Sequence, residues 1–294
     1  MKSTSLTLAL SAVLSTANAY WSGFNVQATL GNGACKSQAD WERDFNTMKS
    51  LPGAFTSMRV YASSDCDTLA NAVPAAIKTG GTILVGVWTE NAAHFAAEKG
   101  ALLKAVQQYG FGWIVAVSVG SEVLYRGEAS ASTLAHQIYD VRGMLSTVPG
   151  YTTAVGVGHV DTWTAWVDSA NTAVITACDF IGTDGYPYFE NTKENGVDQG
   201  YNLFWDSVQK VRDAVSKTGS GAWVWVAESG WPTVGPTENK AIPSVANAQQ
   251  YWSTVACSAF KSGHTFWYSL QDFAANPSFG VVDANYKPIY NLAC

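Results

Sequence analysis

Two glutamates stand at the ends of apolar, strand-like runs, and no other residues of the sequence are better placed to do chemistry. Glu122 follows the run 113–121 (WIVAVSVGS), and Glu228 ends the run 223–228 (WVWVAE). An ionised carboxylate is costly beside apolar residues unless the site needs it. Two carboxyl groups at the ends of parallel strands would face each other across the mouth of a sheet or barrel. There one can attack a sugar carbon while the other protonates the leaving oxygen, so the pattern indicates cleavage of a glycosidic bond.

The elements that must position these glutamates alternate along the chain. Most of the strand-like runs are continuously apolar, as expected for strands that are covered on both faces. We expect strands at 21–26, 57–61, 82–88, 114–120, 153–158, 180–183, 223–228 and 264–268. We expect helices at 37–49, 67–78, 91–109, 130–145, 162–170, 201–217 and 244–260. Such alternation in 294 residues predicts an α/β fold, a single-domain (β/α)8 TIM barrel. A doubly wound sheet is the alternative, although the glycine-rich phosphate loop typical of it is missing.

The N-terminal residues 1–19 are typical of a secretory signal peptide. Lys2 supplies the positive charge, residues 6–14 form a short apolar stretch, and Ala17-Asn18-Ala19 fits a cleavage site. We therefore expect a barrel domain over 20–294 in a secreted protein that is extracellular or located in the cell wall. The formal net charge of −6 and the lack of a Lys/Arg cluster disfavour nucleic-acid and membrane partners. We take the protein to be a monomer.

Five cysteines in a secreted chain predict disulfide bonds and leave at least one thiol free. Cys178 precedes an expected strand, and we take it as the buried free thiol. Cys35 with Cys66 would join the loops after the first two strands, and Cys257 with Cys294 would fasten the C-terminus. The sequence alone does not fix this connectivity, so other pairings stay open. No Cys-x-x-Cys or His-Glu-x-x-His pattern suggests a metal, and we expect no cofactor.

Polar and aromatic side chains also follow other strand ends, where barrel enzymes place their reactive and binding groups. They are Tyr61, Trp88, Asp184, Tyr186, Tyr188, Trp231, Trp267, Tyr268 and Asp272. The alternative for each aromatic side chain is that it covers the end of the core with its polar tip in water and does not contact a ligand. His159 and Asp161 would follow the fifth strand and could form half of a Ser-His-Asp triad. No Gly-x-Ser-x-Gly elbow supplies the serine, so we take His159 as structural or substrate-lining.

The residues around both glutamates resemble glycoside hydrolase family 17, the β-1,3-glucanase family, in its fungal secreted branch. Residues 227–232 (AESGWP) look like the nucleophile motif of the family, and 117–122 (VSVGSE) look like its acid/base motif. The resemblance extends to 59–61 (RVY), 184–188 (DGYPY) and 264–268 (HTFWY), and so covers essentially all of 20–294. It implies a TIM barrel in which Glu228 is the nucleophile and Glu122 the general acid/base.

The resemblance also implies that several of the residues at strand ends contact the sugar. The expected substrate-binding residues are Tyr61, Trp88, Ser121, Asp184, Tyr186, Tyr188, Trp231, Trp267 and Asp272. Ser121 departs from the wider clan, in which an Asn precedes the acid/base and donates to a substrate hydroxyl. A serine hydroxyl can still donate, but over a shorter reach.

Three functions follow from these expectations. The first is a retaining hydrolase that cleaves β-1,3-glucan, acting as an endo-1,3-β-glucanase by double displacement. The second is a β-1,3-glucanosyltransferase, in which a sugar hydroxyl replaces water at the same site. The third is a glucan-binding wall protein without catalysis, which would have no need to keep both glutamates.

Overall fold

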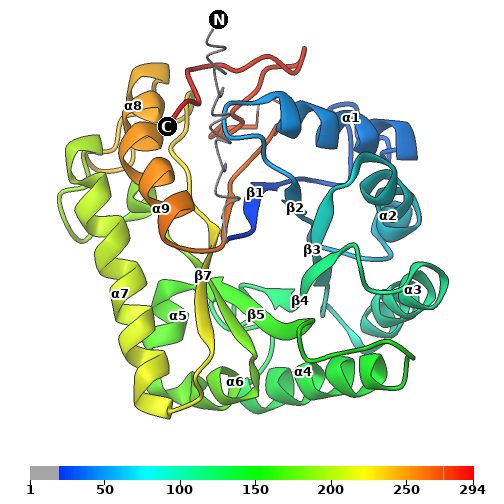
Figure 1. Ribbon diagram of the computed structural model, residues 1–294. Coiled ribbons are helices and arrows are strands. Elements are labelled where there is room, and N and C mark those ends of the chain that lie inside the picture. Colours follow the sequence, from blue (N-terminus) through cyan, green and yellow to red (C-terminus); the bar gives the residue numbers. More distant parts are fainter. Residues whose placement is uncertain (1–19, 274) are drawn as a thin grey trace, which may run out of the picture.

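A closed barrel of parallel strands forms the centre of the molecule (Figure 1). The computed structural model describes residues 20–273 and 275–294, so the predicted signal peptide at 1–19 lies outside the described residues. In the described part of the chain eight strands follow one another around the barrel in sequence order, and β8 pairs with β1. They are β1 (Ser22–Asn25), β2 (Ser57–Arg59), β3 (Thr82–Val87), β4 (Ile114–Ser121), β5 (Gly156–Thr162), β6 (Phe180–Asp184), β7 (Trp223–Glu228) and β8 (Thr265–Trp267). The predicted (β/α)8 barrel is confirmed.

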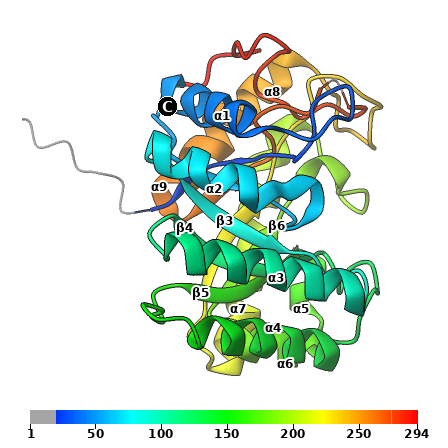
Figure 2. The ribbon, with the colours of Figure 1, turned by 90° about the vertical axis from the view of Figure 1, so that its right-hand side faces the viewer.

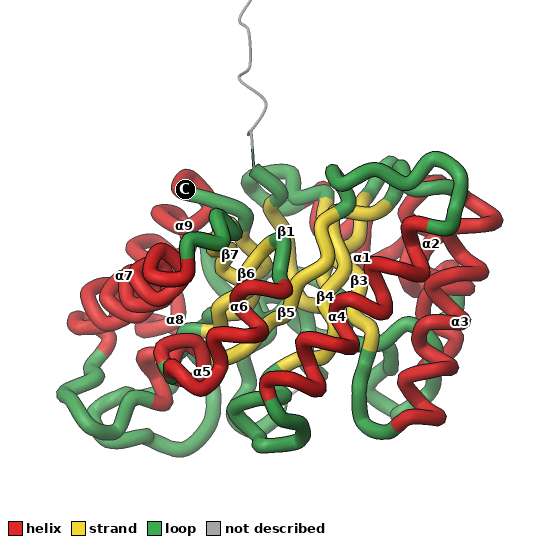
Figure 3. The backbone as a smooth tube through the Cα atoms, turned by 90° about the horizontal axis from the view of Figure 1, so that it is seen from below, coloured by secondary structure: helices red, strands yellow, loops and turns green. Residues whose placement is uncertain are grey.

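Helices surround the barrel and connect its strands (Figure 1); seen from below, the red helices flank the yellow strands on both sides (Figure 3). The α-helices are α1 (Gln38–Ser50), α2 (Thr68–Thr79), α3 (Ala92–Tyr109), α4 (Ala131–Ser146), α5 (Trp163–Val167), α6 (Thr172–Ala177), α7 (Gly200–Thr218), α8 (Val245–Tyr251) and α9 (Cys257–Ser262). Single turns add η1 (Asp65–Asp67), η2 (Ser169–Asn171), η3 (Pro187–Phe189), η4 (Val197–Gln199) and the π-turn η5 (Trp252–Ala256). Helices α2, α3 and α4 lie one beside the next along one side of the barrel (Figure 2). Within the residues that the structure describes, no helix is long and apolar enough to cross a membrane.

Local sequence signals begin and end these helices where they were expected. The hydroxyl of Ser37 accepts a hydrogen bond from the backbone N–H of Asp40, and Ser244 caps α8 in the same way. Gly80 and Gly219 end α2 and α7 in the left-handed conformation that glycine adopts without steric penalty.

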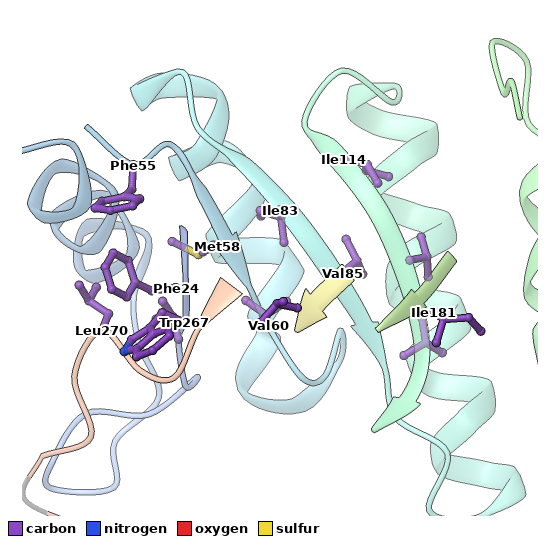
Figure 4. Close-up of a cluster of buried hydrophobic side chains, with 14 of the residues drawn as sticks. Phe24, Phe55, Met58, Val60, Ile83, Val85, Ile114, Ile181, Trp267 and Leu270 are labelled. Carbon is purple, nitrogen blue, oxygen red and sulfur yellow. The ribbon is translucent and has the colours of Figure 1, made fainter. Parts of the chain in front are cut away.

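The apolar side chains form two layers. The larger cluster fills the space between strands and helices, and part of it surrounds β1 to β4 (Figure 4). In that layer Phe24 and Phe55 pack with their ring centroids 4.9 Å apart. A smaller cluster comes from β3 to β8 and includes Phe180 and Trp225, whose rings stack 4.3 Å apart. These two layers fix the barrel on which the loops at the carboxyl ends of the strands rest.

The fifth strand differs from the prediction. It was expected at 153–158, with His159 and Asp161 in the loop beyond it, but β5 continues to Thr162 and both side chains are completely buried inside it. The strand can continue because the two polar groups bond to each other and to the backbone. The helix expected at 162–170 is likewise divided, because α5 ends at Val167 and a separate α6 begins at Thr172.

Candidate active site

A groove of about 1050 Å³ crosses the carboxyl ends of the strands, and both glutamates line it. We call it the rim groove. Its walls are Tyr61, Trp88, Ser121, Glu122, Tyr125, Arg126, Thr162, Trp163, Thr164, Asp184, Tyr186, Phe189, Glu190, Asn191, Thr192, Lys193, Lys210, Glu228, Tyr268 and Pro277. The groove is wide enough for several sugar rings and carries aromatic faces beside polar groups, as sites for small molecules commonly do.

Glu228 is the last residue of β7 and lies at the base of the rim groove. The register between β6 and β7 shifts here, so that Asp184 pairs with Glu228 and Ala227 is an extra residue. Such a bulge re-aims the side chain that follows it. The Glu228 side chain is only 10% exposed, and Tyr61 and Tyr186 donate to its two oxygens at 2.8 and 2.7 Å. Arg59 donates to the same carboxyl group, so three donors hold the Glu228 side chain in place.

Arg59 organises the site from beneath, although no role was predicted for it. It comes from β2, its side chain is 1% exposed, and it pairs with Glu228. Its guanidinium also donates to the amide oxygen of Asn25 at 2.7 Å and to the hydroxyl of Ser121 at 3.0 Å. Asn25 donates in turn to the backbone carbonyls of Ala227 and Phe266. The signal that could have identified Arg59 is a charged residue inside an otherwise apolar strand.

Glu122 follows β4 directly and has a left-handed backbone, with φ of 51°. Its side chain is 28% exposed, and Arg126 donates to Oε2 over 3.2 Å. Burial raises the pKa of Glu122 to about 7, and the negative charge of Glu228 acts in the same direction. Glu122 therefore keeps its proton to a pH at which an ordinary glutamate has lost it.

Asp184 ends β6 beside Glu228 and lines the rim groove. It is 2% exposed, and neither carboxyl oxygen has a hydrogen-bond partner among the described residues. Burial, together with the charge of Glu228, holds the pKa of Asp184 well above its usual range. Asp184 is therefore suited to act as a neutral acid that donates a hydrogen bond into the groove.

The aromatic residues at the rim groove are partly those that were predicted. Tyr61, Trp88 and Tyr186 line the groove, as does Ser121. Burial and the charge of Glu228 raise the pKa values of Tyr61 and Tyr186 well above 10, so both hydroxyls stay protonated as donors.

Sequence reasoning did not assign a site role to several further wall residues. Tyr268 follows β8; it was among the candidates at strand ends but not among the expected substrate-binding residues, and it lines the groove. Tyr125 and Phe189 lie in loops and are 63% and 51% exposed, which is unusual for aromatic side chains. Only the loop conformation brings these two side chains to the groove, and no local pattern in the sequence reports it.

Four predicted contacts lie away from the groove. Tyr188, Trp231 and Trp267 are at most 2% exposed and pack among other aromatic rings, and Trp267 belongs to the cluster in Figure 4. Asp272 accepts hydrogen bonds from the backbone N–H groups of Phe279 and Gly280 and from the hydroxyl of Ser278. These residues follow strand ends, but their side chains support the walls and do not line them.

The disulfide bonds are Cys35–Cys66 and Cys257–Cys294, and within the described residues Cys178 is the free, buried cysteine. A group of potential metal ligands, Asp65, His94 and Glu98, lies outside the rim groove. The Glu98 oxygens there accept hydrogen bonds from the backbone N–H groups of Ser63, Ser64 and Trp88, which satisfies them without an ion.

The rim groove thus holds one carboxyl group, Glu228, that accepts hydrogen bonds from an arginine and two tyrosines, and another, Glu122, whose pKa burial raises to about 7. Such a pair can attack an electrophilic carbon from one side and protonate a leaving oxygen from the other. The same groove offers tyrosine hydroxyls and aromatic faces to a neutral, hydroxyl-rich ligand.

Comparison with known proteins also indicates a glycoside hydrolase. Residues 23–285 match the model of the BtgE/BtgC glycoside hydrolase domain. The chain is 41% identical to the probable glucan endo-1,3-β-glucosidase eglC of Aspergillus fumigatus, over 98% of this chain and 68% of that protein. It is 37% identical to the glucan 1,3-β-glucosidase of Saccharomyces cerevisiae, over 80% of this chain and 75% of that protein. It spans 63% of the corresponding Aspergillus terreus protein.

Among solved structures, the glycoside hydrolase family 17 β-1,3-glucanosyltransferase of Rhizomucor miehei superposes with a TM-score of 0.78. The alignment covers 94% of this chain and 98% of that one at 23% identity, so it supports the fold. From the match over residues 23–285 and the 41% identity to a curated relative, the chain belongs to the BtgE/BtgC glycoside hydrolase domain family.

Proposed function

We propose that this protein hydrolyses β-1,3-glucan with retention of the anomeric configuration, acting within the polysaccharide chain. Glu228 attacks the anomeric carbon and forms a glycosyl–enzyme, while Glu122 protonates the departing sugar. Glu122 then removes a proton from the incoming water, which releases the glycosyl group with its original configuration. The observation that carries this proposal is the contrast between the two carboxyl groups of one groove. Three donors hold the Glu228 carboxyl group, whereas burial raises the pKa of Glu122 to about 7.

The other groove residues have defined tasks in this scheme. Arg59, Tyr61 and Tyr186 hold the attacking carboxylate in one orientation through their hydrogen bonds. Asp184 and Ser121 offer hydrogen-bonding groups to sugar hydroxyls, and Trp88 and Tyr268 offer ring faces for stacking. The relatives support glucan as the substrate, since they are named for β-1,3-glucan cleavage.

The test replaces each glutamate by its neutral isostere. We expect Glu228→Gln to lower hydrolysis of laminarin by at least about 10⁴-fold, because it removes the nucleophile. Glu122→Gln should lower it by about 10²- to 10⁴-fold, the usual contribution of general acid–base catalysis. Circular dichroism checks that both variants fold, and Glu42→Gln, which removes a surface carboxylate paired with Lys78, serves as the matched control. Full activity in either active-site variant would remove that residue from the mechanism, and inverted products observed by NMR would contradict it altogether.

Transfer to a second sugar is a specific alternative outcome of the same chemistry. The exposed rings of Tyr125 and Phe189 at the groove walls could hold an acceptor sugar in place of water. Mass analysis of the products from one pure laminari-oligosaccharide distinguishes hydrolysis from transfer, because products longer than the starting oligosaccharide require transfer. A glucan-binding wall protein without catalysis would bind the same oligosaccharide and release no reducing sugar.

We also propose that the mature protein begins at Tyr20 and is a secreted monomer. Its two disulfide bonds support an oxidising, extracellular location. N-terminal sequencing of protein from the culture medium of an expressing host tests the cleavage site, and light scattering tests the oligomeric state.

A further inference from the structure

Beneath the loop that carries Glu122, a histidine and an aspartate form a completely buried pair. His159 and Asp161 lie on the same face of β5, and both are 0% exposed. The Nε2 atom of His159 is 2.9 Å from Oδ2 of Asp161. Neither side chain lines the rim groove. A buried pair of this kind is costly to form unless hydrogen bonds satisfy both groups, so its partners show what it supports.

The pair bonds to the backbone on both sides of Glu122. On the N-terminal side, Nδ1 of His159 is 2.6 Å from the carbonyl oxygen of Val119. On the C-terminal side, Asp161 accepts hydrogen bonds from the N–H of Leu124 at 2.9 Å and of Tyr125 at 3.3 Å. Between these anchors, the N–H of Glu122 donates to the carbonyl of Val160 at 2.8 Å. The segment 119–125 is therefore bound to β5 at each end.

The backbone between these anchors needs such support. Gly120 and Glu122 have φ values of 71° and 51°, in the left-handed region, which is unfavourable for a residue with a Cβ atom such as Glu122. The pairing of β4 with β5 also shifts register between Ser118 and Ser121. Residues in such conformations persist when the surrounding contacts over-determine them.

The hydrogen-bond donors and acceptors around His159 and Asp161 show why an amide side chain cannot replace the carboxyl group of Asp161. A carbonyl oxygen only accepts, so Nδ1 of His159 carries a proton. Asp161 accepts from the N–H groups of Leu124, Tyr125 and Thr162, and its Oδ2 atom also faces Nε2 of His159. An asparagine at 161 would place an NH₂ group against at least one of these donors and leave a buried N–H without an acceptor.

We propose that His159 and Asp161 are positioning residues which fix the carboxyl group of Glu122 over the rim groove. The inference rests on the proposed role of Glu122 as the acid/base. It assigns the pair to the step in which the leaving oxygen receives its proton. Attack by Glu228 depends on other residues, which come from β1, β2 and the loop after β6.

The electrostatics of the pair add a second effect on Glu122. The charged groups that act on this carboxyl are Glu228 and Asp161, which raise its pKa, and Arg126 and Arg59, which lower it. Loss of the Asp161 charge therefore lowers the pKa of Glu122. The acid form is then lost at a lower pH, so the alkaline limb of the activity profile moves toward lower pH.

The experiment measures kcat/KM for Asp161→Asn on two substrates that differ in their need for an acid. A laminari-oligosaccharide needs a proton on its leaving oxygen, whereas a dinitrophenyl laminaribioside releases dinitrophenolate without one. We expect kcat/KM to fall by about 10- to 100-fold on the oligosaccharide, the effect of a small misplacement of a catalytic group. We expect less than about threefold loss on the dinitrophenyl substrate, whose cleavage gains little from an acid. The alkaline limb on the oligosaccharide should move to lower pH.

A matched control separates positioning from general destabilisation. Asp44→Asn breaks another buried pair, Lys36–Asp44, whose side chains are 3% and 1% exposed and lie away from the groove. It should leave kcat/KM on both substrates unchanged at a temperature where it is folded. Equal losses on the two substrates for Asp161→Asn, or an unmoved pH profile, would overturn the inference.

Two further measurements complete the test. If Asp161→Asn does not fold, hydrogen exchange in the wild-type protein decides, because Leu124 and Tyr125 amides bound to Asp161 should exchange as slowly as those of β5. Fast exchange at both would overturn the inference. Glu122→Gln is measured on the same substrates. If Glu122→Gln kept full activity on the oligosaccharide, the proposed function itself would be contradicted.

Discussion

Glu122 and Glu228 carry the same side chain in opposite surroundings, and this contrast assigns their roles. Glu228 receives hydrogen bonds from Arg59, Tyr61 and Tyr186. Glu122 pairs with Arg126, and burial raises its pKa to about 7. A carboxyl group with a raised pKa suits the acid of such a pair, and one that several donors hold in place suits the nucleophile.

A first expectation concerns Arg126, because its guanidinium contacts the proposed acid directly. It is 3.2 Å from Glu122, lies over the ring of Trp88 at 5.3 Å and lowers the pKa of Glu122. In Arg126→Gln this effect is lost, so the pKa of Glu122 rises and the acid form persists to higher pH. From the pKa of Glu122, we expect the alkaline limb of kcat/KM on laminarin near pH 7 in the wild type and at higher pH in Arg126→Gln.

This direction is opposite to that expected for Asp161→Asn, so the two variants check each other. The matched control is Arg43→Gln, which removes an exposed arginine paired with Asp40 on α1 and should leave the profile unchanged. A limb that moves downward in Arg126→Gln would mean that the titrating group is not Glu122.

A second expectation concerns the proton on Asp184. Burial and the Glu228 charge raise its pKa well above the ordinary value, so asparagine, which resembles the neutral acid in shape, should replace it. We expect Asp184→Asn to keep kcat/KM on laminari-oligosaccharides within about tenfold of the wild type. Asp184→Ala removes the hydrogen-bonding group and should lose at least about tenfold more, since an unpaired sugar hydroxyl costs about 1–3 kcal/mol. Equal losses in the two variants would show that Asp184 acts as a carboxylate.

At the scale of elements, close approach of β2 and β3 places Tyr61 at the groove. A Cβ atom on Gly86 would lie 2.1 Å from the carbonyl oxygen of Tyr61, so only glycine permits this spacing. We expect Gly86→Ala to lower the free energy of unfolding by at least about 1–3 kcal/mol, as overpacking does. Activity should fall as well, because the strand end that carries Tyr61 must shift.

Gly100→Ala is the control for this change, since Gly100 lies in α3 with open space around the Cβ position. It should stabilise the protein by about 0.5–1 kcal/mol, because alanine is the better helix residue. Urea unfolding of both variants measures the difference, and similar unfolding midpoints would contradict the close approach.

The elements also show where sequence reasoning succeeds and where it fails. Strand β7 and the positions of both glutamates were predictable, because a run of apolar residues that ends in a carboxylate is a local pattern. The true extent of β5 was not, because His159 and Asp161 are polar residues that only tertiary hydrogen bonds make acceptable in a strand. Arg59 was overlooked for the same reason: its partners Asn25, Ser121 and Glu228 come from three other strands.

The sequence also did not predict which way a side chain at a strand end points. Tyr186 and Tyr188 lie two residues apart after β6, yet Tyr186 donates to Glu228 while Tyr188 packs beneath the wall against Trp231. The turn η3 decides which ring reaches the groove. Such turns depend on packing against loops from other units, which periodicity does not report.

At the scale of the whole molecule, a disulfide bond fastens the C-terminal residue to helix α9. Cys257 at the start of α9 is joined to Cys294, the last residue, across a sequence separation of 37. Between them lie β8, which pairs with β1 to close the barrel, and Tyr290 and Leu292, which are buried. The disulfide therefore restrains the segment that completes the fold.

We expect the double variant Cys257→Ser/Cys294→Ser to unfold more easily while it keeps its activity. Closing a loop of this length removes conformational entropy from the unfolded chain, which corresponds to about 4 kcal/mol in the chain-entropy model. Urea unfolding should show a loss of this order, whereas kcat/KM on laminarin at 25 °C should stay within about twofold, because neither cysteine lines the rim groove. Cys178→Ala leaves both disulfides intact and should cost less than the double variant. An unchanged unfolding midpoint in the double variant would mean that the packing of Tyr290 and Leu292 alone holds the C-terminal segment against the barrel.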